Sequence, residues 1–374
     1  MSGKKILVLG SGFDHLVKAR GPLLRALAAE GHEVVALTPG GHEVGLKQLA
    51  DWGVGFRPLE FRKASLNPVG DVAYFARLVR QIRAEKPDVL LAFTIKAVIY
   101  GMLAGAAAGV PRRVAMITGL GYAFTEGDET RRKIARVAAH AGYRTALSAA
   151  HRVIFQNSDD LELFRAARLL PKPERAALVS GSGVDTDRFA HAALPEGPLT
   201  ILMVARLLKD KGVFEFLEAA EQVKRARPDV RFVLAGAADE NPAAVPLAEV
   251  QRRVAAGVLD YAGEVMDVRP LLAASHLFVL PSYREGMPLA VLEAMSTGRA
   301  VVTTSVPGCR ETVEAGCNGC LVPPRDADAL AAGILEMIAD REALARAGAA
   351  SRELCERRFA ARVVTAETMR IMFD

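Results

Sequence analysis

The chain has 374 residues, of which 51% are hydrophobic and 24% are charged. This composition excludes disordered and fibrous proteins, and the length suits two domains that each bury a core. The net charge of +5 suits an anionic partner but does not choose among a nucleic acid, a nucleotide and a lipid surface.

Short apolar runs alternate with longer segments of helical period in the first half of the chain. The runs are KKILVLG, HEVVALT, VGFRPLE, PDVLLAF, RRVAMIT and HRVIFQN. Each run is continuous rather than alternating in polarity, which is typical of parallel strands buried on both faces, and the spacers suit crossover helices. Residues 1–180 are therefore predicted to form a doubly wound, Rossmann-like α/β domain.

The first predicted strand leads into a glycine-rich turn, LGSGFD, at residues 9–14. The turn lacks the third glycine of a dinucleotide-binding motif, and no acidic residue ends the second strand to bind a ribose. A nicotinamide or flavin cofactor is therefore not expected. Because Gly12 has no side chain, an anion can approach the backbone N–H groups at the start of the following helix.

A loop and a basic helix stand out later in this domain. Thr118, Gly119 and Gly121 follow a strand and form a side-chain-poor loop at the edge of the sheet where α/β proteins bind ligands. The helix beyond it, residues 131–147, places basic residues opposite Ile, Val, Ala and Leu. Such a helix can lie on an anionic membrane surface; an ordinary surface helix that packs its apolar face inward is the alternative.

The second half of the chain repeats the strand and helix pattern after a segment rich in Gly, Ser and Pro. This segment, residues 181–198, is predicted to be a linker. The runs LTILMVA, VRFVLAG, HLFVLPS, AVVTTS and GCLVPP predict a second doubly wound domain at residues 199–350. Two helical segments follow the last strand, one from residue 327 to about residue 350 and one at residues 351–374.

Two cations lie near the start of the first helix of the second domain. Arg206 follows a strand, and Lys211 precedes Gly212, at which the helix is expected to begin. Together with the free N–H groups of a helix start, the two side chains suit a diphosphate. A solvated pair of basic residues at a helix end is the alternative.

The segment REGMPLAVLEAMSTGRAVVTT, residues 284–304, carries two carboxylates separated by seven residues. Pro288 suits the first turn of a helix, which leaves Glu285 in the preceding loop and places Glu293 about two turns inside. The helix start offers an anion the amides of Gly286, Met287 and Leu289. The carboxylates can accept hydrogen bonds from hydroxyl groups at both ends of a bound diphosphate, although each also fits an ordinary exposed glutamate.

The E-x7-E spacing, together with ARLLKDKG, GVDTDRF and GCNGCLVPPRDADALA, resembles the retaining glycosyltransferases of family 4. The resemblance extends over essentially the whole chain. It implies the GT-B fold, in which two Rossmann-like domains face a cleft and the second domain binds a nucleotide sugar. It also implies that the final helix, residues 351–374, crosses back to the first domain.

The resemblance gives the motif residues their roles. It implies that Arg206 and Lys211 bind the diphosphate of a UDP-sugar, that Glu285 binds the sugar hydroxyls and that Glu293 binds the ribose. We expect Glu285, Arg206 and Lys211 to carry catalysis without a metal or an organic cofactor, because the two cations and the helix start stabilise the departing diphosphate. The resemblance also implies that the loop AGEV, residues 262–265, contacts the base of the nucleotide, through Glu264 and Val265. Further contacts to the UDP-sugar are expected from Gly12, Gly286, Met287, Pro288 and Leu289.

The segments KAVIYG and ITGLGYAF resemble the subgroup that extends undecaprenyl-diphosphate-linked sugars in bacterial glycan assembly, including N-acetylgalactosaminyl transfer. This implies a lipid-linked acceptor at Thr118, Gly119 and Gly121, and a cytoplasmic protein held on the inner face of the cell membrane. Many relatives carry a histidine after the strand predicted from the run RRVAMIT, at the position where this sequence has Thr118. Asp14 and Lys96 are therefore the candidates for assisting the acceptor hydroxyl.

The expected function is the transfer of an N-acetylhexosamine or a hexose from a UDP-sugar to a polyprenyl-diphosphate-linked sugar. A UDP-sugar 2-epimerase of the same architecture, a family 4 transferase with a soluble acceptor, and a nucleotide-sugar-binding protein without turnover are the alternatives. No nucleic-acid partner is expected. The sequences DTD and DAD, at residues 185–187 and 326–328, suit turn and helix-cap chemistry better than a metal site.

Overall fold

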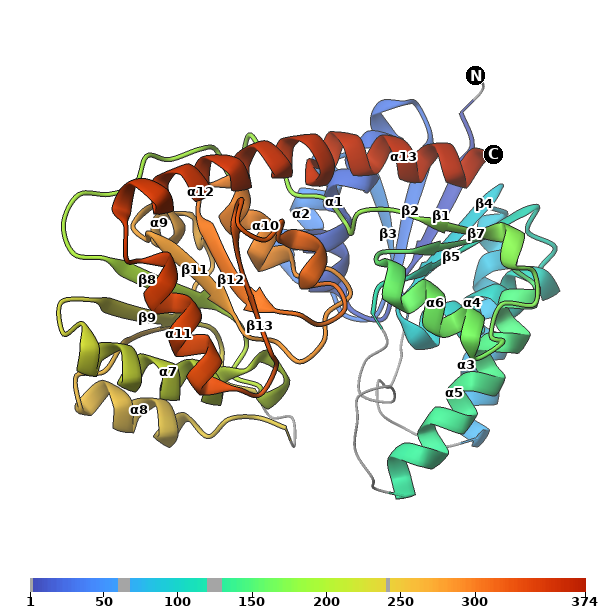
Figure 1. Ribbon diagram of the computed structural model, residues 1–374. Helices are drawn as coiled ribbons and strands as arrows, with labels where there is room; N and C mark the ends of the chain where they lie inside the picture. The colour runs from blue at the N-terminus through green and yellow to red at the C-terminus, as the bar shows by residue number, and fades with distance from the viewer. Residues whose placement is uncertain (1–2, 60–67, 120–129, 240–242) are drawn as a thin grey trace. The chain divides into compact units, whose positions relative to one another are not determined.

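The computed structural model describes residues 3–59, 68–119, 130–239 and 243–374, and the side chains of all of these except residues 68–70 and 130–138 (Figure 1). Contacts divide the chain into two units. The first consists of Met1–Gly183 together with Ala361–Asp374, and the second is the continuous segment Val184–Ala360.

The first unit is built on a parallel sheet of seven strands. Their order is β3 (Val54–Pro58), β2 (Glu33–Thr38), β1 (Lys5–Leu9), β4 (Val89–Phe93), β5 (Arg112–Ile117), β6 (Arg152–Phe155) and β7 (Ala176–Leu178). The helices are α1 (Phe13–Ala29), α2 (Glu43–Asp51), α3 (Pro68–Glu85), α4 (Ile95–Ala107), α5 (Thr130–Ser148), α6 (Ser158–Ala166) and α13 (Ala361–Phe373), with a 3₁₀ turn η2 (Pro173–Arg175).

Continuous apolar runs form the central strands because both faces of this sheet are covered. Leu7 and Leu9 of β1 pack in a core with α3, α4, α5 and α6. Ile6 and Val8 point to the other face and pack with α1, α2 and α13. Since successive side chains of a strand alternate between faces, the single run ILVL supplies both cores.

The second unit is built on a parallel sheet of six strands (Figure 1). Their order is β10 (Asp260–Gly263), β9 (Arg231–Ala235), β8 (Thr200–Val204), β11 (Leu277–Leu280), β12 (Ala300–Thr304) and β13 (Gly319–Val322). The helices are α7 (Val213–Ala226), α8 (Leu247–Ala255), α9 (Arg269–Ala273), α10 (Leu289–Ser296), α11 (Ala327–Met337) and α12 (Arg341–Leu354). Shorter turns are η3 (Lys209–Lys211), η4 (Arg310–Thr312) and the π-helical η5 (Cys355–Phe359).

Helices cover both faces of the second sheet because the strand order reverses at β8. The crossover from β8 to β9 runs in one direction and the crossover from β11 to β12 in the other, so right-handed connections place α7 and α10 on opposite faces. Helix α11 lies beside α7, and α12 packs on α10 and β12 (Figure 1). The predicted pair of doubly wound α/β domains is confirmed, and none of the described helices is long and apolar enough to span a membrane.

The segment expected to be a linker is anchored in the second unit from Val184 onward. Val184 and Phe189 are buried in the core of that unit. The buried Arg299 guanidinium donates hydrogen bonds to the carbonyl oxygens of Ala192 and Ala193, at 2.8 and 3.2 Å. Most of this Gly- and Pro-rich stretch, from Val184 on, therefore packs against the second unit rather than forming a free linker.

The C-terminal helices begin and end at other residues than the sequence suggests. No break occurs near Ser351, because this residue is buried inside α12 and its hydroxyl donates to the Asn318 carbonyl at 3.2 Å. The helix α12 begins instead at Arg341, with Asp340 as its N-cap, and the Asp340 side chain accepts a hydrogen bond from the Glu342 amide. The last helix begins only at Ala361, after the extended Ala360 pairs with Val184.

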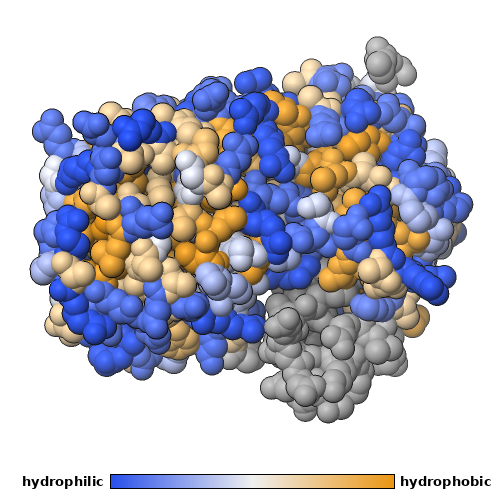
Figure 2. Space-filling view, in the orientation of Figure 1, coloured by the Kyte–Doolittle hydropathy of each residue, from blue (hydrophilic) through white to orange (hydrophobic). Residues whose placement is uncertain are grey.

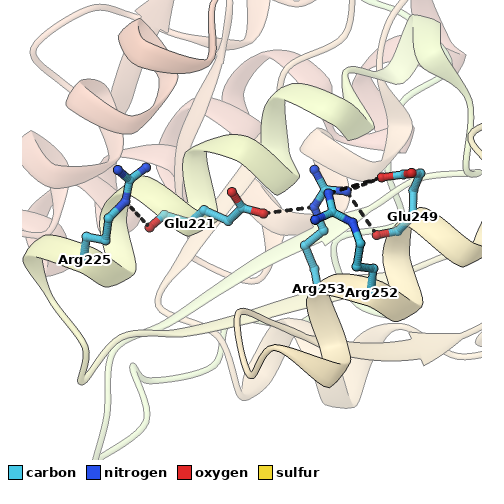
Figure 3. A network of polar contacts seen from close by, with 5 residues as sticks. All are labelled: Glu221, Arg225, Glu249, Arg252 and Arg253. Carbon is cyan, nitrogen blue, oxygen red and sulfur yellow. Dashed lines mark hydrogen bonds and ion pairs between the residues drawn. The ribbon is translucent and has the colours of Figure 1, made fainter.

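A charged network joins α7 and α8 on the outside of the second unit. Hydrophilic side chains gather over these two helices at the lower left of Figure 2. The Arg253 guanidinium lies between two carboxylates, donating to Glu221 Oε1 at 3.1 Å and to Glu249 (Figure 3). The Arg253 side chain is 8% exposed, whereas the neighbouring Arg252, also bonded to Glu249, is 64% exposed.

Arg253→Met is expected to destabilise the second unit by about 1–2 kcal/mol, because it leaves Glu221 and Glu249 facing each other without the buried cation. Thermal and urea unfolding of the variant measure this loss. Arg252→Met removes the same charge from an exposed position and serves as the control, with a much smaller change expected. Equal shifts in the two variants would show that the network contributes no more than an ordinary surface pair.

Candidate functional site

The turn that carries Lys211 is held against the loop that follows β11. Gly212 adopts a left-handed conformation, with φ 72°, and a Cβ atom at this residue would lie only 2.1 Å from the Pro281 carbonyl oxygen. Only glycine permits this approach. The Tyr283 amide donates to the Asp210 carbonyl at 2.9 Å, so η3 and the loop that begins at Pro281 are fixed to each other by their backbones.

Lys211 and Glu285 form an ion pair at the carboxyl edge of the second sheet. Lys211 Nζ lies 2.5 Å from Glu285 Oε1, and the Ser282 hydroxyl donates to the same oxygen at 2.7 Å. The two charged side chains are 26% and 12% exposed, so the pair is largely but not fully removed from solvent. The structure thus brings a predicted diphosphate-binding cation and a predicted sugar-binding carboxylate into direct contact.

The loop around Glu285 is supported from behind by buried residues of β12 and the segment after it. The Glu285 amide donates to the Pro307 carbonyl at 3.1 Å, and the Thr304 hydroxyl donates to the Ser282 carbonyl. Gly308, with φ 78°, lies so close that a Cβ atom there would be 2.6 Å from the Glu285 carbonyl oxygen. Burial raises the pKa of the nearby Cys309 thiol to about 12, so this thiol stays protonated.

Tyr283 is a residue of this loop that sequence reasoning missed. Its phenol donates to Glu215 Oε1, in the first turn of α7, at 2.6 Å, and the Arg325 guanidinium lies over its ring at 4.8 Å. Burial, reinforced by the hydrogen bond to Glu215, raises the pKa of Tyr283 above its usual value. The tyrosine therefore remains a neutral hydrogen-bond donor that joins the loop to α7, a role that no spacing in the sequence signals.

Arg206 follows β8 and meets a carboxylate that was not anticipated. Its Nη1 atom lies 2.7 Å from Asp239 Oδ2, in the segment that follows β9. The predicted second diphosphate-binding cation is thus close to an acidic residue, as Lys211 is. No hydrogen bond between Arg206 and Lys211 or Glu285 is found in the described part of the chain, so the structure shows two separate ion pairs at this edge of the sheet.

The helix predicted to begin at Pro288 is α10, with Pro288 at its N-cap and no side-chain hydrogen bond capping it. Glu293 is the fifth residue of this helix and is half-buried. It therefore lies about one turn inside the helix rather than two, because α10 starts at Leu289. Gly286 and Met287, also half-buried, complete the segment between Glu285 and the helix start.

Glu264 and Val265, expected to contact a base, directly follow β10. Glu264 is exposed and Val265 is half-buried. Because all strands of the sheet are parallel, this segment leaves the sheet at the carboxyl ends of the strands, as do the segments that carry Arg206 and Glu285.

The remaining predicted residues belong to the first unit. Gly12 is the N-cap of α1, in an extended conformation and without a side-chain cap. Asp14 Oδ1 lies 2.9 Å from His42 Nε2, and Lys96 Nζ lies 3.9 Å from Asp71 Oδ1. Thr118 and Gly119 follow β5 and are half-buried.

Gly121 lies outside the described residues, as do the side chains of residues 131–138, which include most of the basic face expected on α5. Within the described part of this helix, the Arg144 guanidinium donates to the Arg168 carbonyl.

The two D-x-D sequences have the local roles that their positions suggest. Asp185 Oδ1 accepts a hydrogen bond from the Arg188 amide at 3.0 Å, within a turn. Asp326 caps α11 by accepting from the Ala329 amide at 2.8 Å. Among the described residues, no group of three or more His, Cys, Asp or Glu side chains is arranged to hold a metal ion.

Two family models match consecutive parts of the chain. Residues 18–181 match the model described as "Glycosyl transferase 4-like domain". Residues 198–340 match the model described as "Glycosyl transferases group 1". The boundary between the two matches falls in the segment around Gly183 where the contacts divide the chain into units.

Similar proteins of known activity align along most of the chain. An N,N'-diacetylbacillosaminyl-diphospho-undecaprenol alpha-1,3-N-acetylgalactosaminyltransferase from Campylobacter jejuni is 29% identical over 337 residues, 86% of either chain. A UDP-Gal:alpha-D-GlcNAc-diphosphoundecaprenol alpha-1,3-galactosyltransferase from Escherichia coli is 28% identical, over 76% of this chain and 75% of its own.

The fold is also similar to solved structures. HepE from Anabaena, solved in complex with UDP-glucose, superimposes with a TM-score of 0.76 over 98% of this chain and 99% of its own, at 20% identity. A glycosyltransferase from Rickettsia africae superimposes with a TM-score of 0.77 over 100% of this chain and 98% of its own, at 17% identity.

Proposed function

The chain belongs to the glycosyltransferases of GT-B fold, with a 4-like domain followed by a group 1 domain, and from this premise we propose that it transfers a sugar from a UDP-sugar to a polyprenyl-diphosphate-linked sugar in bacterial surface-glycan assembly. The observation that carries the proposal is the contact between Lys211 and Glu285 beside the starts of α7 and α10. A cation for a phosphate and a carboxylate for sugar hydroxyls meet there, which suits the bond between the two.

We assign the parts of the UDP-sugar to this edge of the second sheet as follows. Lys211 and Arg206 bind the diphosphate, helped by the uncapped start of α10. Glu285 accepts hydrogen bonds from the transferred sugar, and Glu293 accepts them from the ribose. The base lies at Glu264 and Val265. Support for a UDP-sugar comes from the UDP-Gal-dependent relative and from the structure of HepE with UDP-glucose.

Catalysis would rest on stabilising the departing diphosphate. Negative charge grows on the phosphate oxygens as the glycosidic bond breaks, and a lysine and an arginine offset it without a metal ion. We propose that the acceptor hydroxyl attacks from the face that the diphosphate leaves, with a phosphate oxygen taking its proton. The configuration of the sugar carbon is then retained, and no enzyme nucleophile is needed.

The acceptor is assigned to the first unit. Thr118 and Gly119, at the carboxyl end of β5, and Lys96, in the first turn of α4, would contact the lipid-linked sugar. Asp14 and Lys96 remain the candidates for assisting its hydroxyl. Both named relatives use a sugar on diphosphoundecaprenol, which supports an acceptor of this class and an association with the inner face of the membrane.

The test is a transfer assay with purified protein. Radiolabelled UDP-N-acetylgalactosamine, UDP-N-acetylglucosamine and UDP-galactose are each incubated with bacterial membranes or with N-acetylglucosaminyl-diphosphoundecaprenol, and label is counted in the organic extract. Label in the extract, reduced to background by Glu285→Gln, is the expected result. Label that stays in water as a changed nucleotide sugar would indicate an epimerase, and label on a water-soluble acceptor would overturn the lipid half of the proposal.

A further inference from the structure

Asp239 is a carboxylate at the predicted diphosphate site to which none of the preceding roles applies. It lies 2.7 Å from Arg206, a residue assigned above to the diphosphate. We propose that Asp239 is a positioning residue that competes with the diphosphate for Arg206, holding the guanidinium when the site is empty and helping to expel the nucleoside diphosphate after transfer. This inference rests on the proposed function, because it requires a diphosphate at Arg206.

The backbone keeps the two residues together independently of their charges. The amide that precedes Arg206, that of Ala205, donates to the carbonyl of Ala235 at the end of β9, and the amide that follows it, that of Leu207, donates to the Ala237 carbonyl just beyond the strand, each at 3.0 Å. Gly236 makes this approach possible, because a Cβ atom there would lie 1.7 Å from the Ala205 carbonyl oxygen. Asp239 therefore stays within reach of Arg206 whether or not a ligand is present.

The exposure of the two side chains indicates which of them moves to a ligand. The Arg206 side chain is 61% exposed and that of Asp239 is 19% exposed. A diphosphate arriving from solvent meets the guanidinium first and must replace the carboxylate as its partner. Because an arginine presents several donors in one plane, the exchange needs only a reorientation of the Arg206 side chain.

Competition between Asp239 and the diphosphate for Arg206 affects the binding and the release of the nucleotide in opposite ways. The Asp239 carboxylate weakens binding of the nucleoside diphosphate, both by occupying Arg206 and by repelling the phosphates. For the same reason it speeds the departure of the product. Product release limits turnover in many enzymes, so a carboxylate at this place raises the rate at the expense of affinity.

The experiment compares binding of UDP and of uridine to the full chain and to Asp239→Asn by titration calorimetry, with dissociation of UDP followed by stopped flow. We expect Asp239→Asn to bind UDP about three- to tenfold more tightly and to release it more slowly by a similar factor. Affinity for uridine, which has no phosphate, should not change. In the Arg206→Ala background, Asp239→Asn should tighten UDP binding much less, because only the direct repulsion of the phosphates then remains.

Asp260→Asn is the matched control. Asp260 pairs with Arg231 at a similar distance, 2.8 Å, but both residues are the first of their strands and therefore lie at the amino ends of the strands, away from the predicted site. Its UDP affinity should equal that of the wild type. Unchanged or weaker UDP binding by Asp239→Asn would overturn the inference alone and leave Asp239 as a structural support for Arg206. If neither the wild type nor any variant binds UDP, the assignment of the UDP-sugar fails and the inference fails with it.

Discussion

Glu285→Gln is expected to lower kcat about 100-fold while changing the KM for the UDP-sugar no more than about threefold. The side chain keeps its size and its ability to accept from Ser282, but it loses the charge that faces Lys211 at 2.5 Å. The amide therefore neither orients the lysine nor compensates positive charge on the sugar as the bond to the diphosphate breaks. Initial rates at varied UDP-sugar and fixed acceptor separate kcat from KM.

Glu293→Gln provides the comparison for this prediction. Glu293 is assigned to the ribose, which does not change during the reaction, so its loss should raise KM and leave kcat near the wild-type value. Thermal unfolding of both variants verifies that they fold. If Glu285→Gln raised only KM and Glu293→Gln lowered only kcat, the assignment of the two carboxylates would be reversed.

Lys211→Met should have a still larger effect, a fall in kcat/KM of about 1000-fold. The substitution keeps an unbranched side chain but removes the cation from the diphosphate and leaves the 12%-exposed Glu285 carboxylate without its partner. The variant should bind the UDP-sugar less tightly and stabilise the departing diphosphate less well. The double variant Lys211→Met/Glu285→Gln should lose little more than Lys211→Met alone, because the two side chains act as a pair.

Lys209→Met is the control for the lysine variant. Lys209 belongs to the same turn, η3, and carries the same charge, but its side chain is exposed. Its kcat/KM should stay close to the wild-type value. A comparable loss in both lysine variants would contradict a specific role for Lys211 and indicate that only the overall positive charge of the turn matters, which raising the salt concentration would then reproduce.

The central strands and the loop that carries Glu285 before α10 could be predicted because their signals are local. A strand buried on both faces must be apolar along its length, as β1 and β11 are. Pro288 signals the start of α10, so the sequence itself places Glu285 in the preceding loop and Glu293 inside the helix. The strands that escaped detection, β7 and β10, lie at sheet edges and are partly exposed, so they carry no continuous apolar run.

The residues that complete the site could not be found in this way, because their roles come from tertiary contacts. Asp239 is separated from Arg206 in the chain by η3, α7 and β9, and only the pairing of β8 with β9 brings the two residues together. Tyr283 meets Glu215 through the approach of η3 to the loop after β11, which Gly212 allows. A sequence shows that Gly212 is a glycine but not which backbone it must accommodate.

Helix α13 makes the two units differ in the order in which they can be completed during synthesis. Val364, Met369, Ile371 and Met372 belong to the same core as β1 and α1, although more than 350 residues separate Ile6 from Val364 in the chain. A ribosome-bound chain therefore holds every residue of Val184–Ala360 before it holds the last helix of the first unit. The unit translated first is therefore completed last, and until then the apolar residues of α1 that pack on α13 in the finished protein lack that cover.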